Sequence, residues 1–169
     1  MQFIKKLVGD RIYLSPRGTS DEEVEKFTDW MNDFQTTDFI GRSGQAITFI
    51  GEKEWLENSV KNVQDRSFSI IELNHNKLIG TISLENFNWI DRSAVLGIFI
   101  GDSEFRGNGY GTEAIKLLLE YGFKYLNLHS IRLDLLAINE RAHKCYLKCG
   151  FKDTGCSREA IYVSGKYYD

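Results

Sequence analysis

Three glycines within five positions, close behind an arginine, restrict the fold of this sequence more than any other feature. They stand in FRGNGYG, residues 105–111. Glycine loses more conformational freedom on folding than any other residue, so such a cluster needs a reason in the backbone. One interpretation is a loose surface turn. The other is a backbone cradle that receives a phosphate-bearing cofactor.

The segments on either side of the glycines favour the cradle. AVLGIFIG (94–101) is rich in β-branched and aromatic residues and predicts a strand. Residues 111–128 predict an amphipathic helix. A helix N-terminus presents unpaired N–H groups and a partial positive charge, both of which attract anions. Arg106 can add a charge-assisted hydrogen bond at the rim, and Thr112 can cap the helix or donate its hydroxyl.

Three kinds of phosphate loop can be compared with this segment. The Walker A pattern needs a lysine directly after its glycines, and none follows here. The dinucleotide fingerprint GxGxxG comes directly after a strand, whereas this spacing is GxGxG after a polar loop. The third pattern, R/Q-x-x-G-x-G/A, holds the pyrophosphate of coenzyme A. Arg106, Gly109 and Gly111 occupy its fixed positions.

The remaining pattern predicts one α+β domain with a mixed, mostly antiparallel twisted sheet flanked by helices. Helices are expected at 19–33, 52–64, 111–128 and 139–149. Strands are expected at 8–15, 67–73, 77–87, 94–101 and 130–138, followed by a hairpin that turns at Ser164–Gly165. Residues 34–51 are expected to be irregular.

Composition and charge exclude several classes of protein. The net charge of −3 lacks the excess of basic residues typical of nucleic-acid binders. Three cysteines without a CxxC pair do not indicate a disulfide framework. There is neither an apolar run long enough to cross a membrane nor a signal peptide pattern, so we expect a cytoplasmic protein.

With Asn139 opening NERAHKCYLKCGF, the chain resembles the GNAT family of acyl-CoA N-acyltransferases. In that family an Asn opens a helix that carries Ala, Tyr and a terminal Gly-Phe, and the closest likeness covers residues 94–151. The stretch NLHSIRLDLLAINERAHKCYLKCGF is most similar to the branch that acetylates spermidine or the N-termini of ribosomal proteins. In that branch a last strand follows the hairpin, whereas this sequence stops at Asp169. The missing strand has two alternative explanations: a truncated sequence, or a sheet that keeps an open edge.

The resemblance implies a single N-acetyltransferase domain over 1–169, with acetyl-CoA as cosubstrate and no metal. The edge of the strand before the glycines would bind the thioester and pantetheine through its backbone. Asn139 would cap its helix and hydrogen-bond the pantetheine amide. The cofactor contacts implied in this way are Phe99, Ile100, Gly101, Arg106, Gly107, Asn108, Gly109, Tyr110, Gly111, Thr112, Asn139, Ala142 and Tyr146.

For catalysis, the resemblance implies that Tyr146 assists the departing thiolate, although a core tyrosine is the simpler alternative. The general base that deprotonates the amine is less clear. Glu85, at the end of a strand bordering the acceptor side in related enzymes, is our candidate. Glu72 and Asp91 are competitors, and a chain of water molecules can replace any of them.

The acceptor implied by the resemblance is a polyamine or a protein N-terminus, and a small amino sugar or antibiotic is an alternative. The acidic segments 21–25 and 29–38 favour a polycation slightly. A homo-oligomer is expected by resemblance alone. The rival function is a non-catalytic acyl-CoA-binding regulatory module, and nucleotide binding comes third. Cys145, Cys149, Cys156 and His143 lack the spacing of a zinc site.

Overall fold

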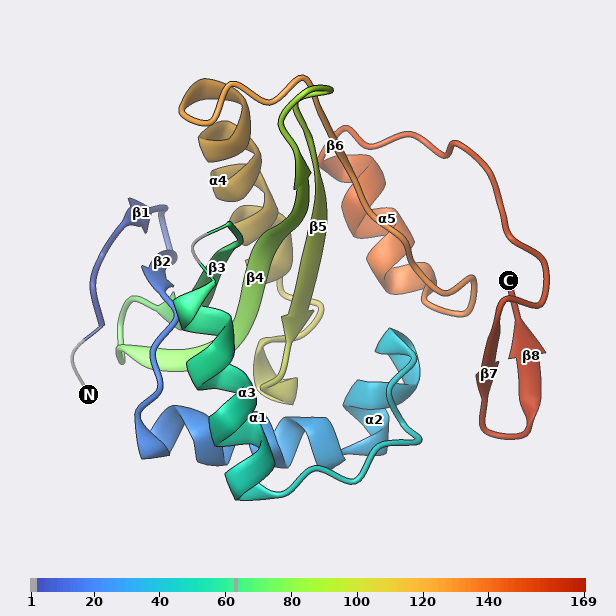
Figure 1. Cartoon of the computed structure of the whole chain (residues 1–169), viewed down its shortest axis with the longest axis horizontal. Helices are drawn as coiled ribbons and strands as arrows, with labels where there is room; N and C mark the ends of the chain where they lie inside the picture. Colours follow the sequence, from blue (N-terminus) through green and yellow to red (C-terminus); the bar gives the residue numbers. More distant parts are fainter. Residues whose placement is uncertain (1–2, 63) are drawn as a thin grey trace.

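The computed structural model describes residues 3–62 and 64–169 and contains one six-stranded sheet in the order β1-β2-β3-β4-β5-β6 (Figure 1). All neighbouring strands are antiparallel except β5 and β6, which are parallel. The strands of this sheet are β1 (Leu7–Val8), β2 (Ile12–Pro16), β3 (Arg66–Glu72), β4 (Lys77–Asn88), β5 (Ser93–Ile100) and β6 (Ser130–Arg132). The predicted α+β class with a mostly antiparallel sheet is confirmed.

Helices pack on both faces of the sheet (Figure 1). They are α1 (Asp21–Asn32), α2 (Phe34–Thr37), α3 (Phe49–Lys61), α4 (Tyr110–Lys124) and α5 (Glu140–Lys148), with short 3-10 turns η1 (Asp38–Ile40) and η2 (Ser103–Phe105). Among these described helices, none is both long enough and apolar enough to cross a membrane.

The alternation of side chains along the strands divides the core between the two faces. Ile12 and Leu14 of β2 pack with Ile115 and Leu118 of α4 in one cluster. Tyr13, between them in the sequence, points to the opposite face and joins a second cluster with Val24 and Leu56 from α1 and α3. This period of two therefore fixes which helix covers which face.

Helix capping explains why the chain between α1 and α3 is more regular than expected. The Asp33 side chain accepts hydrogen bonds from Gln35 N at 3.0 Å and from Thr36 Oγ1 at 2.7 Å, which starts α2. Thr48 caps α3 by accepting from Gly51 N at 3.1 Å, so this helix begins before the predicted start. The prediction that 34–51 is irregular was therefore wrong for its two ends.

The strand predicted at 130–138 is much shorter in the structure. Only Ser130–Arg132 pairs with β5, through Ser93, Ala94 and Val95. Beyond these residues the two segments separate, and among the described residues the edge of β5 from Leu96 onward has no strand partner on that side. This divergence creates the opening in which the candidate site lies.

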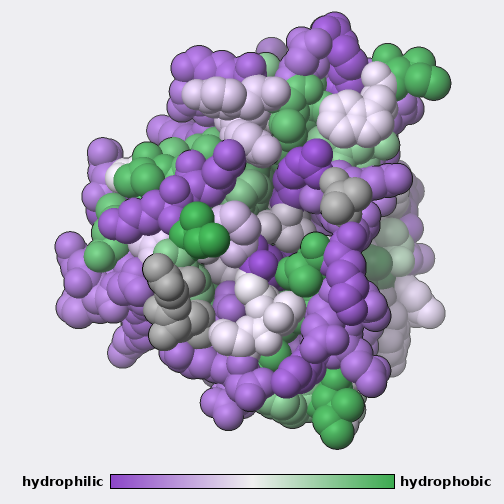
Figure 2. All heavy atoms as spheres, turned by 60° about the vertical axis from the view of Figure 1, so that its left-hand side comes forward, coloured by the Kyte–Doolittle hydropathy of each residue, from purple (hydrophilic) through white to green (hydrophobic). Residues whose placement is uncertain are grey.

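The C-terminal hairpin forms a small sheet of its own (Figure 1). Its strands are β7 (Ile161–Val163) and β8 (Lys166–Tyr168), and its turn at Ser164–Gly165 is the predicted one, with positive φ at both residues. On the N-terminal side of the molecule, Figure 2 shows mostly hydrophilic side chains with hydrophobic ones in separate spots.

Candidate active site

The glycine-rich segment forms a tight loop in front of α4. Gly107 and Gly109 adopt φ values of 76° and 85°, in the left-handed region that side chains disfavour. Gly109 is the N-cap of α4 and makes no side-chain capping bond, so the expected capping by Thr112 is not found. The N–H groups of the first turn lack intrahelical acceptors, as at every helix start. This loop, residues 106–112, is called the phosphate loop below.

The phosphate loop opens onto a wide groove whose lining extends from β5 and α5 to α1, α3 and the C-terminal segment; it is called the β5–α5 groove below. It is lined by residues from both predicted motifs and by the candidate base, including Glu85, Gly97, Ile98, Phe99, Ile100, Arg106, Gly107, Gly109, Gly111, Thr112, Asn139, Ala142 and Tyr146. The structure thus brings together most of the residues singled out from the sequence. Asn108 and Tyr110 are not among the lining residues.

Asn108 and Tyr110 face the opposite side of the phosphate loop. The Asn108 side chain donates from Nδ2 to the Glu104 carbonyl at 3.0 Å. The Tyr110 ring packs edge-on against Phe105 and beneath the guanidinium of Arg11. Their contact with a cofactor stays a prediction, and their side chains are already engaged within the protein.

Arg106 turns its side chain back toward the end of β5. Its Nε donates to the Ile100 carbonyl at 2.9 Å, and its Nη2 donates to the Gly101 carbonyl and to Thr36 Oγ1, both at 2.6 Å. Burial, followed by the nearby positive charge of Arg141, lowers the pKa of Arg106 from its usual value. Arg106 therefore ties the phosphate loop to β5 and α2, and its expected bond to a phosphate stays a prediction.

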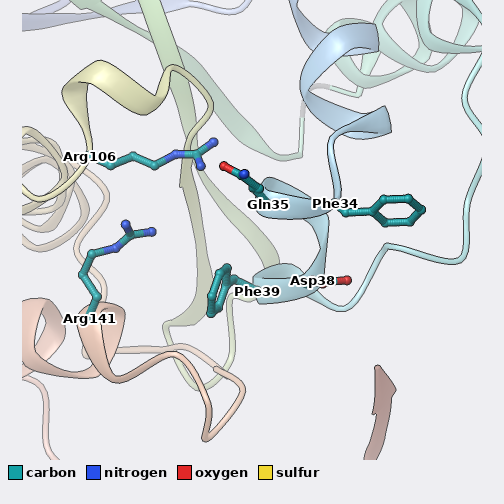
Figure 3. A pocket seen from close by; sticks show the side chains of 6 residues that line it. All are labelled: Phe34, Gln35, Asp38, Phe39, Arg106 and Arg141. Atoms are coloured by element: carbon teal, nitrogen blue, oxygen red, sulfur yellow. The ribbon is translucent and has the colours of Figure 1, made fainter. Parts of the chain in front are cut away.

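Arg141, in the first turn of α5, was not singled out from the sequence. Figure 3 shows the guanidinium groups of Arg106 and Arg141 extending into one pocket of about 390 Å³, with Gln35 and Phe39 on its opposite side. Two cations beside the start of α4 favour an anionic ligand. Only the fold could have revealed Arg141, because it brings α5 to the phosphate loop.

The unpaired edge of β5 lies along the same groove. The N–H groups of a strand alternate between its two sides. Gly101 N donates to the Ile79 carbonyl at 3.0 Å, on the β4 side, so the N–H groups of Ile98 and Ile100 point to the open side. The Gly101 N–H, one of the backbone groups expected to contact the cofactor, is therefore already hydrogen-bonded within the sheet. Phe99 packs edge-on against Phe27 and Trp30, in keeping with a core role.

Asn139 and Ala142 occupy the first turn of α5. Asn139 Oδ1 accepts from Ala142 N at 3.1 Å, which confirms the predicted cap. Its Nδ2 donates to the Phe39 carbonyl at 3.4 Å, across the groove. The role of either residue as a ligand of pantetheine stays a prediction.

Tyr146 lies one turn further along α5 and is half-buried beside Phe151. Burial raises its pKa to about 12, with smaller contributions from Cys145 and Cys149. Within the described part of the chain its phenol has no hydrogen-bond partner. At neutral pH the phenol is protonated and can donate to an atom that enters the groove.

The three candidate bases lie in different settings. Glu85 lines the groove and accepts from Ser83 Oγ at 2.6 Å. Glu72 is buried at the end of β3, and its carboxylate accepts from Asn74 N and His75 N of the following turn, both at 2.9 Å. Asp91 is exposed in the β4–β5 turn and accepts from Asn88 Nδ2. Of the three, only Glu85 is among the lining residues of the groove.

Two charged residues of the groove escaped the sequence analysis. Glu52, in the first turn of α3, is buried, which raises its pKa. Arg17 is buried too, and burial lowers its pKa while Glu85, Glu52 and Glu23 oppose that shift. Both line the β5–α5 groove. A Glu and an Arg in separate segments carry no spacing signal, so the tertiary structure was needed to find them.

The cysteines have structural contacts. Cys145 Sγ lies 3.1 Å from Thr112 Oγ1, which joins α5 to the start of α4. Burial raises the pKa of Cys149 to about 11. In residues 3–62 and 64–169, no group of three or more His, Cys, Asp and Glu side chains is placed to hold a metal ion.

Comparisons with known proteins agree with this geometry. A family model described as an acetyltransferase (GNAT) domain matches residues 11–152. The spermidine N(1)-acetyltransferase of Vibrio cholerae is 33% identical over 117 residues, which cover 69% of this chain and 66% of that protein, just under two thirds of its length. The probable N-acetyltransferase YjcK of Bacillus subtilis is 28% identical over 174 residues, covering 96% of this chain and 92% of that protein.

Solved structures show the same fold. The crystal structure of the V. cholerae spermidine N-acetyltransferase in complex with CoA and spermine has a TM-score of 0.83 at 26% identity, covering 95% of this chain and 92% of the other. A second structure of that enzyme, described as dodecameric, has a TM-score of 0.75 at 25% identity and covers 95% of this chain and 91% of the other. With a family model that spans most of the sequence, this protein belongs to the GNAT family of acetyltransferases, whose acetyl donor is acetyl-CoA.

Proposed function

We propose that this protein transfers the acetyl group of acetyl-CoA to a primary amine, with both reactants bound at once. In this proposal residues 1–169 act as one N-acetyltransferase domain, and its cofactor core is 94–151. The observation that carries the proposal is that the phosphate loop, the open edge of β5 and the Tyr146 phenol line one groove. Holding two reactants in one place supplies much of the rate in such a reaction.

The groove supplies donors for the two polar parts of acetyl-CoA. The N–H groups at the start of α4, with Arg106 and Arg141 nearby, would hold the pyrophosphate. The N–H groups on the open side of β5 would bind pantetheine and the thioester oxygen. The left-handed glycines of the loop support this assignment, because they let the backbone turn its amides toward an anion.

The chemistry balances without a covalent enzyme intermediate. The lone pair of the neutral amine forms a bond to the thioester carbon, the C–S bond breaks, and the proton lost by the amine ends on the coenzyme A thiolate. An ordinary thiol has a pKa of about 8.5, far below that of Tyr146, so full transfer of the phenol proton is unfavourable. Tyr146 therefore acts by donating a hydrogen bond to the charge that develops on sulfur.

Glu85 is our candidate for taking the amine proton, directly or through water. Its place in the groove supports this choice over Glu72 and Asp91. A free alkylamine has a pKa of about 10.4 and is mostly protonated at neutral pH, so Glu85 would take this extra proton before the attack. The proton that ends on the thiolate is the one that the neutral amine loses as the amide forms.

A polyamine such as spermidine is the acceptor that we favour, and a protein N-terminus is the alternative. Relatives named spermidine N-acetyltransferases support it. The part of the groove where we place the acceptor also has two carboxylates, Glu52 and Glu85, and one cation, Arg17. The acidic segment 21–25 contributes less to the attraction of a polycation, because Glu23 is buried and takes part in the capping box of α1. We further propose a homo-oligomer, as in the dodecameric relative, and a cytoplasmic location.

The test measures thiol release from acetyl-CoA with spermidine, spermine and short peptides that carry free N-termini. Tyr146→Phe is compared with Tyr125→Phe, which removes a phenol from an exposed position outside the groove. We expect turnover with one class of amine and a loss of roughly 100-fold in kcat for Tyr146→Phe alone. Tight acetyl-CoA binding without turnover by any amine would favour the non-catalytic module, and absence of binding would overturn the proposal.

A further inference from the structure

Arg11, at the start of β2, reaches the phosphate loop from the side opposite the groove. Its Nη1 donates to the Asn108 carbonyl at 2.9 Å, and its Nε donates to Glu113 Oε2 at 3.1 Å. The guanidinium lies over the Tyr110 ring, 4.5 Å from its centre. The Arg11 side chain therefore contacts Asn108, Tyr110 and Glu113, although these residues are about a hundred positions away in the sequence.

Glu113 completes this contact from the first turn of α4. Its Oε1 accepts from Arg11 N at 2.8 Å and from Ile12 N at 3.3 Å. Gly9 makes room for the carboxylate, because a Cβ there would lie 2.5 Å from Glu113 Oε1. The carboxylate is thereby turned toward β2 and is paired with a cation.

Two physical consequences follow for the phosphate loop. In a trans peptide the carbonyl and the next N–H point in opposite directions, so fixing the Asn108 carbonyl toward Arg11 turns the Gly109 N–H away from it. A carboxylate in the first turn of α4 would also repel a pyrophosphate bound there. The charge of Arg11 offsets that repulsion.

We propose that Arg11 is a positioning residue for acetyl-CoA, which acts through the phosphate loop without touching the reacting atoms. This inference rests on the proposed function, since it assumes that the loop binds the phosphates of acetyl-CoA. Arg11 holds the Asn108 peptide in the orientation that serves the groove and neutralises Glu113. The fold does not depend on the pair alone, because Glu113 still accepts two backbone N–H groups when the guanidinium is removed.

The experiment compares Arg11→Ala, Arg11→Lys and Arg11→Ala/Glu113→Gln with wild type. The matched control is Lys124→Ala, which removes a surface ion pair with Glu120 from the far end of the same helix. The dissociation constant of CoA is measured by titration calorimetry. The value of kcat/KM is measured with acetyl-CoA and with S-acetylpantetheine, which lacks the pyrophosphate, and Tm is recorded for each variant.

We expect Arg11→Ala to weaken CoA binding roughly tenfold, as for a lost hydrogen bond to a charged group, and Lys124→Ala to leave it unchanged. Activity with S-acetylpantetheine should stay at the wild-type level. Arg11→Lys should recover part of the affinity, because an ammonium keeps the charge without the planar fork of donors. The double variant should bind CoA more tightly than Arg11→Ala, because it removes the negative charge that was left without its neighbouring cation.

Two results would overturn the inference. One is an Arg11→Ala variant that binds CoA like wild type. The other is an equal loss of kcat/KM with acetyl-CoA and S-acetylpantetheine, which would indicate general damage to the fold. If wild type itself binds no CoA, the proposed function fails as well, so the two failures are distinguishable.

Discussion

At the residue scale, Tyr146 illustrates what surroundings add to a motif. Its place on the helix after Asn139 is visible in the sequence, but its pKa depends first on burial and then on the charge interaction with Cys145 and Cys149. Burial raises the pKa to about 12 and keeps the phenol a donor over the whole physiological range. The structure thus makes it a hydrogen-bond donor and a poor source of free protons.

This shift predicts a dependence of stability on pH. The unfolded phenol ionises at a pKa of about 10, below the folded value. Stability from the protonated, buried Tyr146 is therefore fully present below pH 10 and is lost as the pH rises toward 12. Urea unfolding of wild type and Tyr146→Phe at pH 8 and pH 10.5 measures this. Wild type should lose more stability than the variant between the two values, and equal losses would contradict the assignment.

At the scale of elements, the close approach of β4 and β5 sets the edge on which the groove depends. A Cβ at Gly80 would overlap the Phe99 carbonyl and lie 3.0 Å from Ile100 Cα. A Cβ at Gly101 would overlap the Trp30 ring. Glycine at these two positions therefore lets the end of β5 approach β4 on one side and α1 on the other.

Gly80→Ala should therefore destabilise the protein by about 1–3 kcal/mol, as overpacking of a rigid backbone contact does. The same variant should lower kcat/KM for acetyl-CoA, because β5 has to shift. Gly44→Ala is the control, since a Cβ there meets nothing within 4 Å and Gly44 does not line the groove. Urea unfolding and steady-state kinetics measure both effects. A Gly80→Ala protein as stable as the control would show that the strands can separate at little cost.

At the scale of the whole molecule, charged residues from distant segments gather along the groove. Arg106 and Arg141 stand beside the phosphate loop, where an anion is expected. Glu52 and Glu85 line another part of the groove, where we propose that the acceptor binds, with the buried Arg17 and with Arg42. The net charge of −3 says nothing of this arrangement, which arises because the fold brings residues of β4, α3 and α5 into the lining of one groove.

Glu52→Gln should raise KM for spermidine roughly fivefold at low ionic strength, and less in high salt, where the attraction is screened. KM for acetyl-CoA should not change. Glu54→Gln, on an exposed position of the same helix outside the groove, is the matched control. Steady-state kinetics at two salt concentrations test this. Equal effects of the two substitutions would show that Glu52 has no special place in acceptor binding.

The sequence by itself determined the fold class and the family, because glycine spacing, helix periodicity and caps are local properties. The phosphate loop, the cap Asn139 and the position of Tyr146 followed from residues close together in the chain. The tertiary structure alone decided the separation of β5 from the segment after β6, and with it the end of the predicted strand at Arg132. It also decided the placing of Arg11, Arg141 and Glu52, since their effect depends on contacts between segments far apart in the chain, which no local pattern records.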